Sequence, residues 1–196
     1  MADRVVLFID AQNMYQGARR AFFDRFAHYV QGQFDPQALG RLIVDRGPTT
    51  RVLQQVRVYT GRPEATKEHK SYAAHLRQVA AWKAKGVVVI PRTLRYPATW
   101  PQEKAREKGI DVHLAVDFVT LALEGFYEVG IMASADTDLV PALEYVHRKL
   151  GRTVEVVAWR SARARGRLSI SGANIWCHWI DRVGYDAIAD PTDYTL

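Results

Sequence analysis

Continuous apolar runs of strand length recur along this chain and alternate with segments of helical periodicity. The first run, VVLFI within residues 4–10, has no polar residue to face solvent, which is typical of a strand buried on both faces of a parallel sheet. Strands that alternate with helices predict an α/β fold with a parallel sheet covered by helices on both faces. The five predicted strands are residues 4–10, 52–61, 87–94, 128–135 and 153–159.

The segments between these strands carry helix signals. Asp35 before Pro36 predicts a capped helix start, because Asp accepts bonds from the free amides and Pro suits the first turn. The third helix is predicted to bury one stripe made of Tyr72, Leu76, Val79 and Ala80, and to stop at Gly86. The five predicted helices are residues 13–26, 34–47, 64–86, 109–126 and 138–151.

Length and composition favour one globular domain. The chain has 196 residues, 48% of them hydrophobic and 24% charged, and we assign residues 1–185 to a single domain and 186–196 to a flexible tail. No apolar run approaches the roughly 20 residues that span a bilayer, and the N-terminus lacks a signal-peptide layout. Cys177 is the single cysteine, which excludes an intrachain disulfide or a cysteine-rich zinc site. These features predict a cytoplasmic protein with no membrane partner.

The net charge of +6 is compatible with a polyanionic partner, and its distribution is more informative. Cations concentrate in residues 103–108 and 160–167, whereas acids gather near residue 10, in 111–117 and in 136–138. A basic exterior around small acidic sites suits a metal-using enzyme that acts on phosphodiesters. The alternative is that the basic runs are ordinary solvated loops.

The acids are predicted to meet at one edge of the sheet. Asp10 ends the first strand, Asp136 and Asp138 follow the fourth, and Asp111 begins the helix that leads into the fourth. Ligands of open parallel sheets bind at the carboxyl ends of the strands, where the strand order reverses. If the first and fourth strands are neighbours, these carboxylates converge and repel one another unless they gain protons or bind a cation. Oxygen ligands favour Mg²⁺ or Mn²⁺ over zinc.

Each of these polar residues also has a structural explanation. Asp111 could be a helix N-cap, and so could Asp136 or Asp138, although one cap needs only one acid. Asp117 lies six residues after Asp111, about 240° around an ideal helix, so the two share a site only if Asp111 precedes the helix proper. Asn13 could cap the first helix, or hold a scissile phosphate or a water on the metal.

Three sequence blocks, FIDAQNMY (8–15), EKGIDVHLAVDFVTLA (107–122) and ASADTDLVPALEYVHRKLGRTVEVVAW (133–159), together resemble the NYN-domain family of PIN-like nucleases. The resemblance covers about residues 4–160. It implies a three-layer α/β/α sandwich with a parallel five-stranded sheet of order 3-2-1-4-5. It also implies a divalent-metal-dependent ribonuclease that hydrolyses the phosphodiester bonds of single-stranded or structured RNA with Mg²⁺ or Mn²⁺.

The resemblance assigns roles to the acids. The metal ligands are Asp10, Asp111, Asp136 and Asp138, and the predicted catalytic set adds Asp117 and Asn13. Ser134 matches a small polar residue beside the third acid. Lys108 matches the basic residue that precedes Asp111 and could contact phosphate, with an ordinary exposed lysine as the alternative. The chain departs from the family in carrying Ala11 and Ala135 where glycine is frequent, which bears on the shape of the cleft.

Other function classes stay open. Arg163 and Arg165 lie in the basic run after the fifth strand, on the carboxyl edge, and are predicted to bind RNA. The chain has no GxSxG elbow, no GxxxxGK[ST] loop and no recognised histidine metal spacing. An RNA-binding or adaptor module with a non-catalytic acidic crevice and a metal-dependent phosphatase are the alternatives. Residues 174–185 are predicted to pack a final strand or helix, with base stacking as the alternative.

Overall fold

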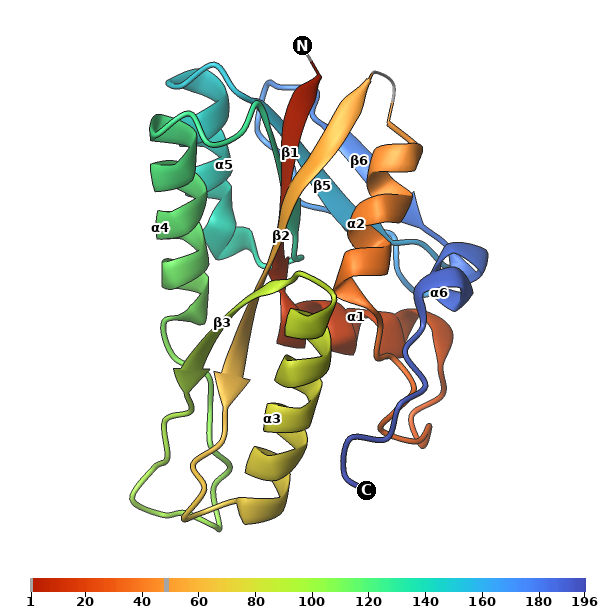
Figure 1. Ribbon diagram of the computed structural model, residues 1–196, viewed down its shortest axis with the longest axis vertical. Coiled ribbons are helices and arrows are strands. Elements are labelled where there is room, and N and C mark those ends of the chain that lie inside the picture. Colours follow the sequence, from red (N-terminus) through yellow and green to blue (C-terminus); the bar gives the residue numbers. More distant parts are fainter. Residues whose placement is uncertain (1, 48–49) are drawn as a thin grey trace.

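The protein is described here by a computed structural model that covers residues 2–47 and 50–196. Its centre is a parallel sheet of order β3-β2-β1-β4-β5-β6, with helices on both faces (Figure 1). The strands are β1 (Asp3–Asp10), β2 (Arg51–Arg62), β3 (Val88–Thr93), β4 (Val129–Ala133), β5 (Thr153–Trp159) and β6 (Trp176–Ile180). The predicted α/β/α architecture is confirmed, and the sheet has six strands rather than five.

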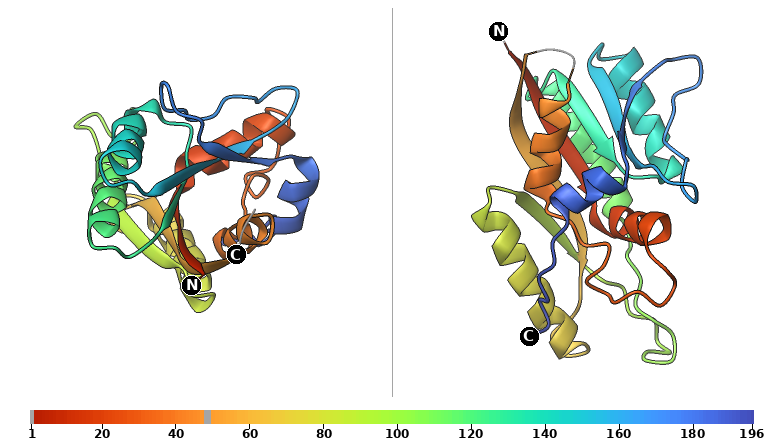
Figure 2. Two further views of the ribbon diagram at one scale, coloured as in Figure 1. Left: turned by 90° about the horizontal axis from the view of Figure 1, so that it is seen from above. Right: turned by 90° about the vertical axis from the view of Figure 1, so that its right-hand side faces the viewer.

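Two apolar cores, one on each face of the sheet, hold the layers together. The helices are α1 (Ala11–Phe22), α2 (Pro36–Asp45), α3 (His69–Ala84), α4 (Ile110–Leu123), α5 (Val140–Arg148) and α6 (Arg182–Ile188). One core joins α1, α2, α3 and α6 to the sheet, and the other joins α4 and α5 to the opposite face (Figure 2). Val5, Leu7 and Ile9 enter the first core, while Val6 and Phe8 enter the second. This division explains why β1 is apolar throughout.

The carboxyl ends of β1 and β4 lie side by side. Their register pairs Ile9 with Ala133, so Asp10 and the residues after β4 reach the same edge of the sheet. On its other side β1 pairs with β2, where Asp10 is opposite Tyr59. The strand order therefore reverses between β1 and β4, as the placement of the acids required.

The helix predictions succeed at α2 and fail in part at α3. Asp35 caps α2 and accepts hydrogen bonds from the amides of Gln37 (2.9 Å) and Ala38 (3.1 Å). Helix α3 begins at His69, later than predicted, and Leu76 on the predicted stripe is 45% exposed. The residues that α3 buries are His75, Val79 and Trp82. Only Val79 is both in the predicted stripe and among the buried residues, because α3 packs on the sheet through a face next to that stripe.

The sixth strand comes from the segment in which a final strand or helix was expected. Strand β6 pairs in parallel with β5, and Ile175 and Ile180 are buried beside it. Trp176 faces outward with 57% of its surface exposed, and Trp179 is half-buried. Helix α6 follows directly and continues to residue 188. The assignment of residues 186–196 as a flexible tail stays a prediction.

The C-terminal segment runs beside α3 (Figures 1 and 2). Arg77 of that helix donates a hydrogen bond of 2.7 Å to the carbonyl oxygen of Tyr194, and the hydroxyl of Tyr29 donates to Asp193 at 2.6 Å. Across residues 2–47 and 50–196, no helix has the length and apolar character that crossing a membrane requires.

Candidate active site

Asp10 stands at the centre of the carboxyl edge, where β1 passes directly into α1. Its side chain is the N-cap of α1 and accepts a 3.0 Å hydrogen bond from the amide of Asn13, while Ser134 contacts its other oxygen at 3.4 Å. Only 8% of Asp10 is exposed, and this burial raises the pKa of its carboxyl group. The two hydrogen bonds oppose that rise, and the negative charges of Asp136 and Asp111 add to it. Three of the predicted acids therefore interact electrostatically.

Ser134 links the two acids on β1 and β4. It is almost fully buried, and its hydroxyl oxygen accepts the amide of Asp136 at 3.1 Å while the same hydroxyl donates towards Asp10. Asp136 in turn caps the short 3-10 turn Thr137–Leu139, accepting from the amide of Asp138 at 3.0 Å. The cap of the 3-10 turn thus uses Oδ1 of Asp136, and Oδ2 takes no part in it.

Asp111 and Asp138 face each other across an open groove between α4 and the turn after β4. Both residues line this groove, and Asp138 is exposed. The N-cap of α4 is Gly109, in the left-handed conformation with φ of 71°, so Asp111 is not the cap and lies in the first turn. The positive end of the helix dipole favours a carboxylate there. Capping therefore does not explain why an acid is present at position 111.

Glu107 joins this group of acids and was missed in the sequence because it lies in a run that reads as cationic. Its carboxylate accepts the amide of Gly61, at the end of β2, at 2.8 Å. Partial removal of the carboxylate from water raises its pKa to about 6, the Gly61 amide opposes this rise, and the charges of Asp10 and Asp111 add to it. The structure thus brings a fourth acid within electrostatic range of Asp10.

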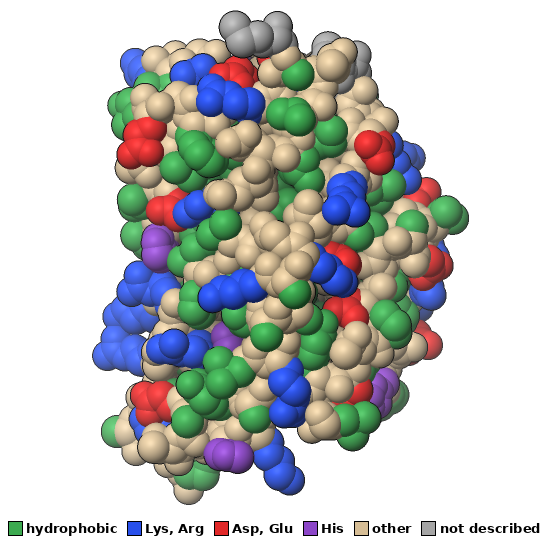
Figure 3. Space-filling view, viewed as in Figure 1, with side chains coloured by type: hydrophobic (Ala, Val, Ile, Leu, Met, Phe, Trp, Pro, Cys, Tyr) green, Lys and Arg blue, Asp and Glu red, His purple; other side chains and the backbone are tan. Residues whose placement is uncertain are grey.

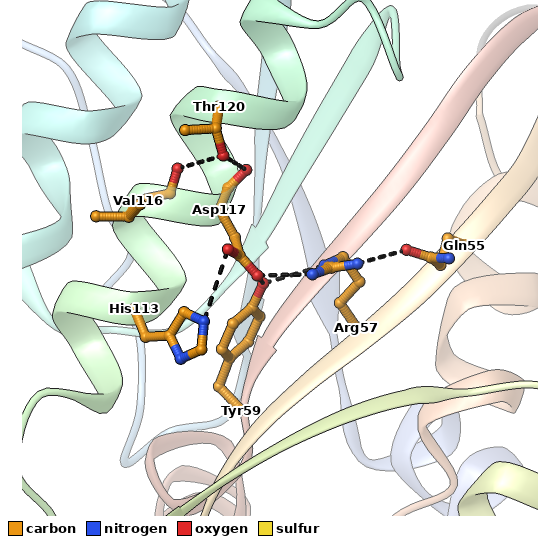
Figure 4. A network of polar contacts seen from close by, with 7 residues as sticks. All are labelled: Gln55, Arg57, Tyr59, His113, Val116, Asp117 and Thr120. Atoms are coloured by element: carbon orange, nitrogen blue, oxygen red, sulfur yellow. Dashed lines mark hydrogen bonds and ion pairs between the residues drawn. The ribbon is translucent and has the colours of Figure 1, made fainter.

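Asp117 is held in a different network, on the β2 side of α4 (Figure 4). One of its carboxylate oxygens accepts hydrogen bonds from Arg57 at 2.6 Å and from the hydroxyl of Tyr59 at 2.7 Å. The other oxygen lies 3.7 Å from Nε2 of His113. Its negative charge is balanced by Arg57, so Asp117 is not a free ligand in this arrangement. Because Tyr59 pairs with Asp10 across β1 and β2, the network is adjacent to the acids in the sheet.

Asn13 connects α1 to the loop after β4. Its side-chain oxygen accepts a 2.9 Å hydrogen bond from the amide of Ala135, the residue before Asp136. Asp10 caps the helix, so the capping alternative for Asn13 is wrong. Among the described residues no partner takes the two donor hydrogens of the Asn13 side-chain amide.

The comparisons with known proteins can now be set beside this geometry. A family model described as the NYN domain matches residues 4–169, a span that includes all the acids of the candidate site. The chain belongs to the NYN domain family. NYN domains are generally nuclease-like hydrolases of the PIN-like group, which typically depend on a divalent metal and act on RNA. The predicted family is therefore confirmed.

The fold of this NYN domain is also found in a solved structure. A crystal structure of a protein of unknown function from Vibrio parahaemolyticus is similar, with a TM-score of 0.54 and 14% sequence identity. The similarity covers 80% of this NYN domain chain and 82% of that one. At this identity the likeness shows the fold alone. No curated protein matches the chain.

The donor set of the NYN domain suits a hard divalent ion in its chemistry. The acids around Asp10 offer oxygen atoms only, which Mg²⁺ and Mn²⁺ prefer. Within residues 2–47 and 50–196, no three Asp, Glu, His or Cys side chains are already grouped closely enough to hold an ion. Binding an ion therefore has to draw Asp111 or Asp136 closer to Asp10, against the repulsion that raises the pKa of Asp10 in its absence.

Cations flank the acids on the side of β3. Lys108 is exposed and lines a small depression together with Arg95 and Arg106. Figure 3 shows Lys and Arg side chains gathered at the edge of the molecule beside β3 and the start of α4. This patch lies next to Glu107 and Asp111 in the chain, where it can attract a polyanion towards the acids.

Arg163 and Arg165 lie farther from the acids than their place after β5 suggests. Arg163 donates a 3.2 Å hydrogen bond to the carbonyl oxygen of Phe23 and lies 3.5 Å from Asp24, both beyond the C-terminal end of α1. Asp10 caps the opposite end of that helix, and 12 helical residues span about 18 Å. Arg165 is exposed. Arg163 can therefore contact a nucleic acid bound at the acids only if that nucleic acid extends along α1.

Proposed function

We propose that this NYN domain is a divalent-metal-dependent ribonuclease that hydrolyses phosphodiester bonds of RNA. The observation that carries the proposal is the convergence of Asp10 and Asp136 at the carboxyl ends of β1 and β4, where Ser134 contacts both residues and Asp111 of α4 is close enough to raise the pKa of the buried Asp10 further. Capping uses one oxygen of Asp10 and one of Asp136 and does not require a group of like charges, which reduces stability when the carboxylates are ionised. A cation bound between these carboxylates would remove the repulsion.

Asp10, Asp111 and Asp136 would hold the ion, with Asp138 as a further ligand or an outer partner. When bound, Mg²⁺ or Mn²⁺ supplies Lewis-acid stabilisation of the charge that develops on the phosphate oxygens. Glu107, with a pKa near 6, is poised to accept or return a proton close to neutral pH. We assign Asp117 a positioning role through Tyr59, which lies opposite Asp10 in the sheet.

The neighbouring polar groups would orient the substrate. Ser134 fixes the separation of Asp10 and Asp136 by touching both. Asn13 can donate its free amide hydrogens to a phosphate oxygen, and Lys108 can pair with a phosphate on the β3 side. Arg163 and Arg165 would hold a more distant part of the RNA backbone. A cytoplasmic site of action stays a prediction.

The test is incubation of the purified protein with RNA, with single-stranded DNA and with a small phosphomonoester, each with Mn²⁺, with Mg²⁺ and with chelator. We expect cleavage of RNA that requires the metal and that Asp136→Asn abolishes. Asp45→Asn serves as the matched control, because Asp45 is an exposed acid at the end of α2. Hydrolysis of the phosphomonoester alone would indicate a phosphatase. RNA binding without cleavage under all metals would indicate a binding or adaptor module.

A further inference from the structure

A partly open cavity of about 220 Å³ lies on the other face of the sheet from the acids of α4. Its walls come from α1, from α3, from the segment before α2 and from the end of β2. The polar wall residues are Gln12, Gln33, Thr60 and Gln78, and the aromatic ones are Tyr15, Phe34 and Trp82. The volume is below the roughly 300 Å³ of pockets for drug-sized ligands, so the cavity suits one ring system.

The cavity walls include residues adjacent to Asp10. Ala11 and Gln12, which line it, follow Asp10 directly in the chain. On the neighbouring strand Thr60, another lining residue, follows Tyr59, the register partner of Asp10. A nucleotide whose phosphate lies at the acids therefore has this cavity as an immediate neighbour.

The polar groups of the cavity are neutral. Its lining contains three glutamine amides and no Asp, Glu, Lys or Arg, which sets it apart from the acids and from the cationic patch beside Lys108. Glutamine amides match the mixed donors and acceptors of a base edge, whereas a phosphate needs cations. Tyr15, Phe34 and Trp82 add aromatic surface against which an unstacked base can pack.

Two polar atoms in these walls have no hydrogen-bond partner among the described residues. They are the indole Nε1 of Trp82, a donor on a side chain that is only 6% exposed, and Oε1 of Gln33, an acceptor. An unpaired buried polar atom destabilises the folded state, so such atoms in a native protein need an explanation. Rotation of these side chains towards the cavity would let a ligand with an acceptor and a donor satisfy both atoms.

The backbone around Gln33 is fixed independently of its side chain. Its carbonyl oxygen accepts the hydroxyl of Tyr185 at 3.0 Å and the amide of Asp190 at 3.2 Å. Tyr15 on the facing helix is held by a 2.7 Å bond from its hydroxyl to the carbonyl of Tyr29. The walls are therefore set in place by contacts that leave the Gln33 side chain unused.

We propose that this cavity binds a single unstacked base of the RNA, adjacent to the phosphate that is cut. The proposal deepens the ribonuclease function and rests on it for the identity of the ligand. The base inserts between α1 and α3, with its polar edge towards Trp82 and the glutamines and its ring against the aromatic walls. The enzyme then recognises the base beside the cut.

The first experiment measures binding of short single-stranded RNA in which one nucleotide at a time is replaced by an abasic one. Ca²⁺ takes the place of Mg²⁺, so the readout does not depend on cleavage. We expect one abasic position to weaken binding about tenfold, within the range found for a single base on an aromatic surface. Trp82→Phe and Gln78→Ala should each remove most of that difference. Gln54→Ala, at an exposed glutamine on β2, should retain it.

The second experiment follows the indole N–H signals by NMR during addition of the same RNA. The Trp82 signal should shift, and its loss in Trp82→Phe identifies it. The signal of Trp159 is an internal reference, because its Nε1 already donates to the carbonyl of Met14 at 2.9 Å. If every abasic position weakens binding to the same extent and the Trp82 signal does not move, the proposal is overturned, even if RNA is cleaved.

The outcomes separate the two claims. If RNA is never cleaved but the abasic profile has one sharp minimum that Trp82→Phe removes, the base site stands and the ribonuclease function falls. If Trp82 and Gln33 merely pair with each other, Trp82→Phe lowers the melting temperature and leaves the abasic profile unchanged, which also overturns the base site.

Discussion

The side-chain oxygen of Asn13 accepts the amide of Ala135 at 2.9 Å and thereby ties the start of α1 to the loop that carries Asp136. The same asparagine has two unused donor hydrogens, so it has either a positioning task alone or a second task at the substrate. Asn13→Ala and Asn13→Asp distinguish these tasks, because alanine removes the whole amide group, whereas aspartate keeps an acceptor oxygen and lacks the donors.

We expect Asn13→Ala to lower both activity and stability, the latter by about 1 kcal/mol for the lost hydrogen bond. Asn13→Asp should keep most of the stability. If the donors contact the phosphate, Asn13→Asp should lose activity as severely as Asn13→Ala at saturating metal. Thermal melting and single-turnover cleavage across a metal titration measure both effects, and full activity of Asn13→Asp would limit Asn13 to positioning the loop.

Asp136 and Asp117 should respond in opposite ways to replacement by asparagine. Asp136→Asn removes a repelling charge, so the metal-free protein should become more stable while cleavage falls more than about 100-fold, since even residues outside the ligand shell commonly matter 10–100-fold. Asp117→Asn weakens the bonds from Arg57 and Tyr59 and should cost about 1.5–3 kcal/mol. Denaturant unfolding without metal measures the change in the free energy of unfolding for each substitution. A change in the same direction for both would contradict the different roles of Asp136 and Asp117.

Metal should stabilise the wild type through Asp10. An ion that binds only the folded state raises the melting temperature as its concentration exceeds its dissociation constant. We expect millimolar Mg²⁺ or Mn²⁺ to raise the melting temperature of the wild type and of Asp45→Asn equally, and to have little effect on Asp10→Asn. Asparagine keeps the oxygen that caps α1, so the comparison isolates the charge. Equal shifts in all three proteins would point to a general salt effect.

The positions of the acids could be predicted because they depend on strand ends, which apolar runs mark clearly. The α4 helix was equally predictable, since Leu114 and Phe118 recur at helical spacing and both are buried. The pairing of Asp117 with Arg57 could not be foreseen. It depends on which residues of β2 face α4, and that follows from strand register and sheet twist.

The role of Glu107 and the cavity beside Asp10 also could not be predicted from the sequence. Glu107 follows Arg106 and precedes Lys108, so the local pattern indicates a cationic loop, and only the fold brings its carboxylate to the amide of Gly61. The cavity gathers Gln12, Gln33 and Gln78 from three separate segments. Neutral side chains so far apart in the chain carry no local signal.

A buried ionic network should make stability depend on pH. Glu155 accepts two hydrogen bonds from Arg51, at 2.8 and 2.9 Å, and lies 2.7 Å from Nε2 of His178. Burial alone would raise the pKa of Glu155, but the bonds from His178 and Arg51 outweigh it and hold the pKa below its ordinary 4.5. The folded state therefore favours the carboxylate, and its contribution is complete above about pH 4.5 and is lost as the pH falls through the lowered pKa.

Glu155→Gln should accordingly cost about 3–5 kcal/mol at pH 7, because it removes the negative charge that faces Arg51 in a dry environment. The difference between mutant and wild type should shrink below pH 4.5. Denaturant unfolding from pH 3.5 to pH 7.5 measures it, and a constant difference across this range would show that the charge of Glu155 is not the stabilising feature.

The last prediction concerns how far the RNA extends. Arg163 is anchored beyond the C-terminal end of α1, and Asp10 lies at its N-terminal end, about 18 Å away along a 12-residue helix. Arg163→Ala with Arg165→Ala should therefore weaken the binding of long single-stranded RNA of any sequence, and leave very short oligonucleotides unaffected. Each phosphate neutralised on a single strand adds about 0.7 to the slope of log affinity against log salt, so the slope should flatten by roughly one unit.

Metal affinity should stay unchanged in this double variant, because neither arginine contacts the acids. Lys108→Ala is the comparison, since Lys108 lies beside Glu107 and should affect short and long RNA alike. Filter binding across a salt series, with a short and a long RNA, gives the slope of log affinity against log salt for the wild type, the arginine double variant and Lys108→Ala. Wild-type slopes for the arginine variant on long RNA would place the path of the backbone along β3 and Lys108 instead of along α1.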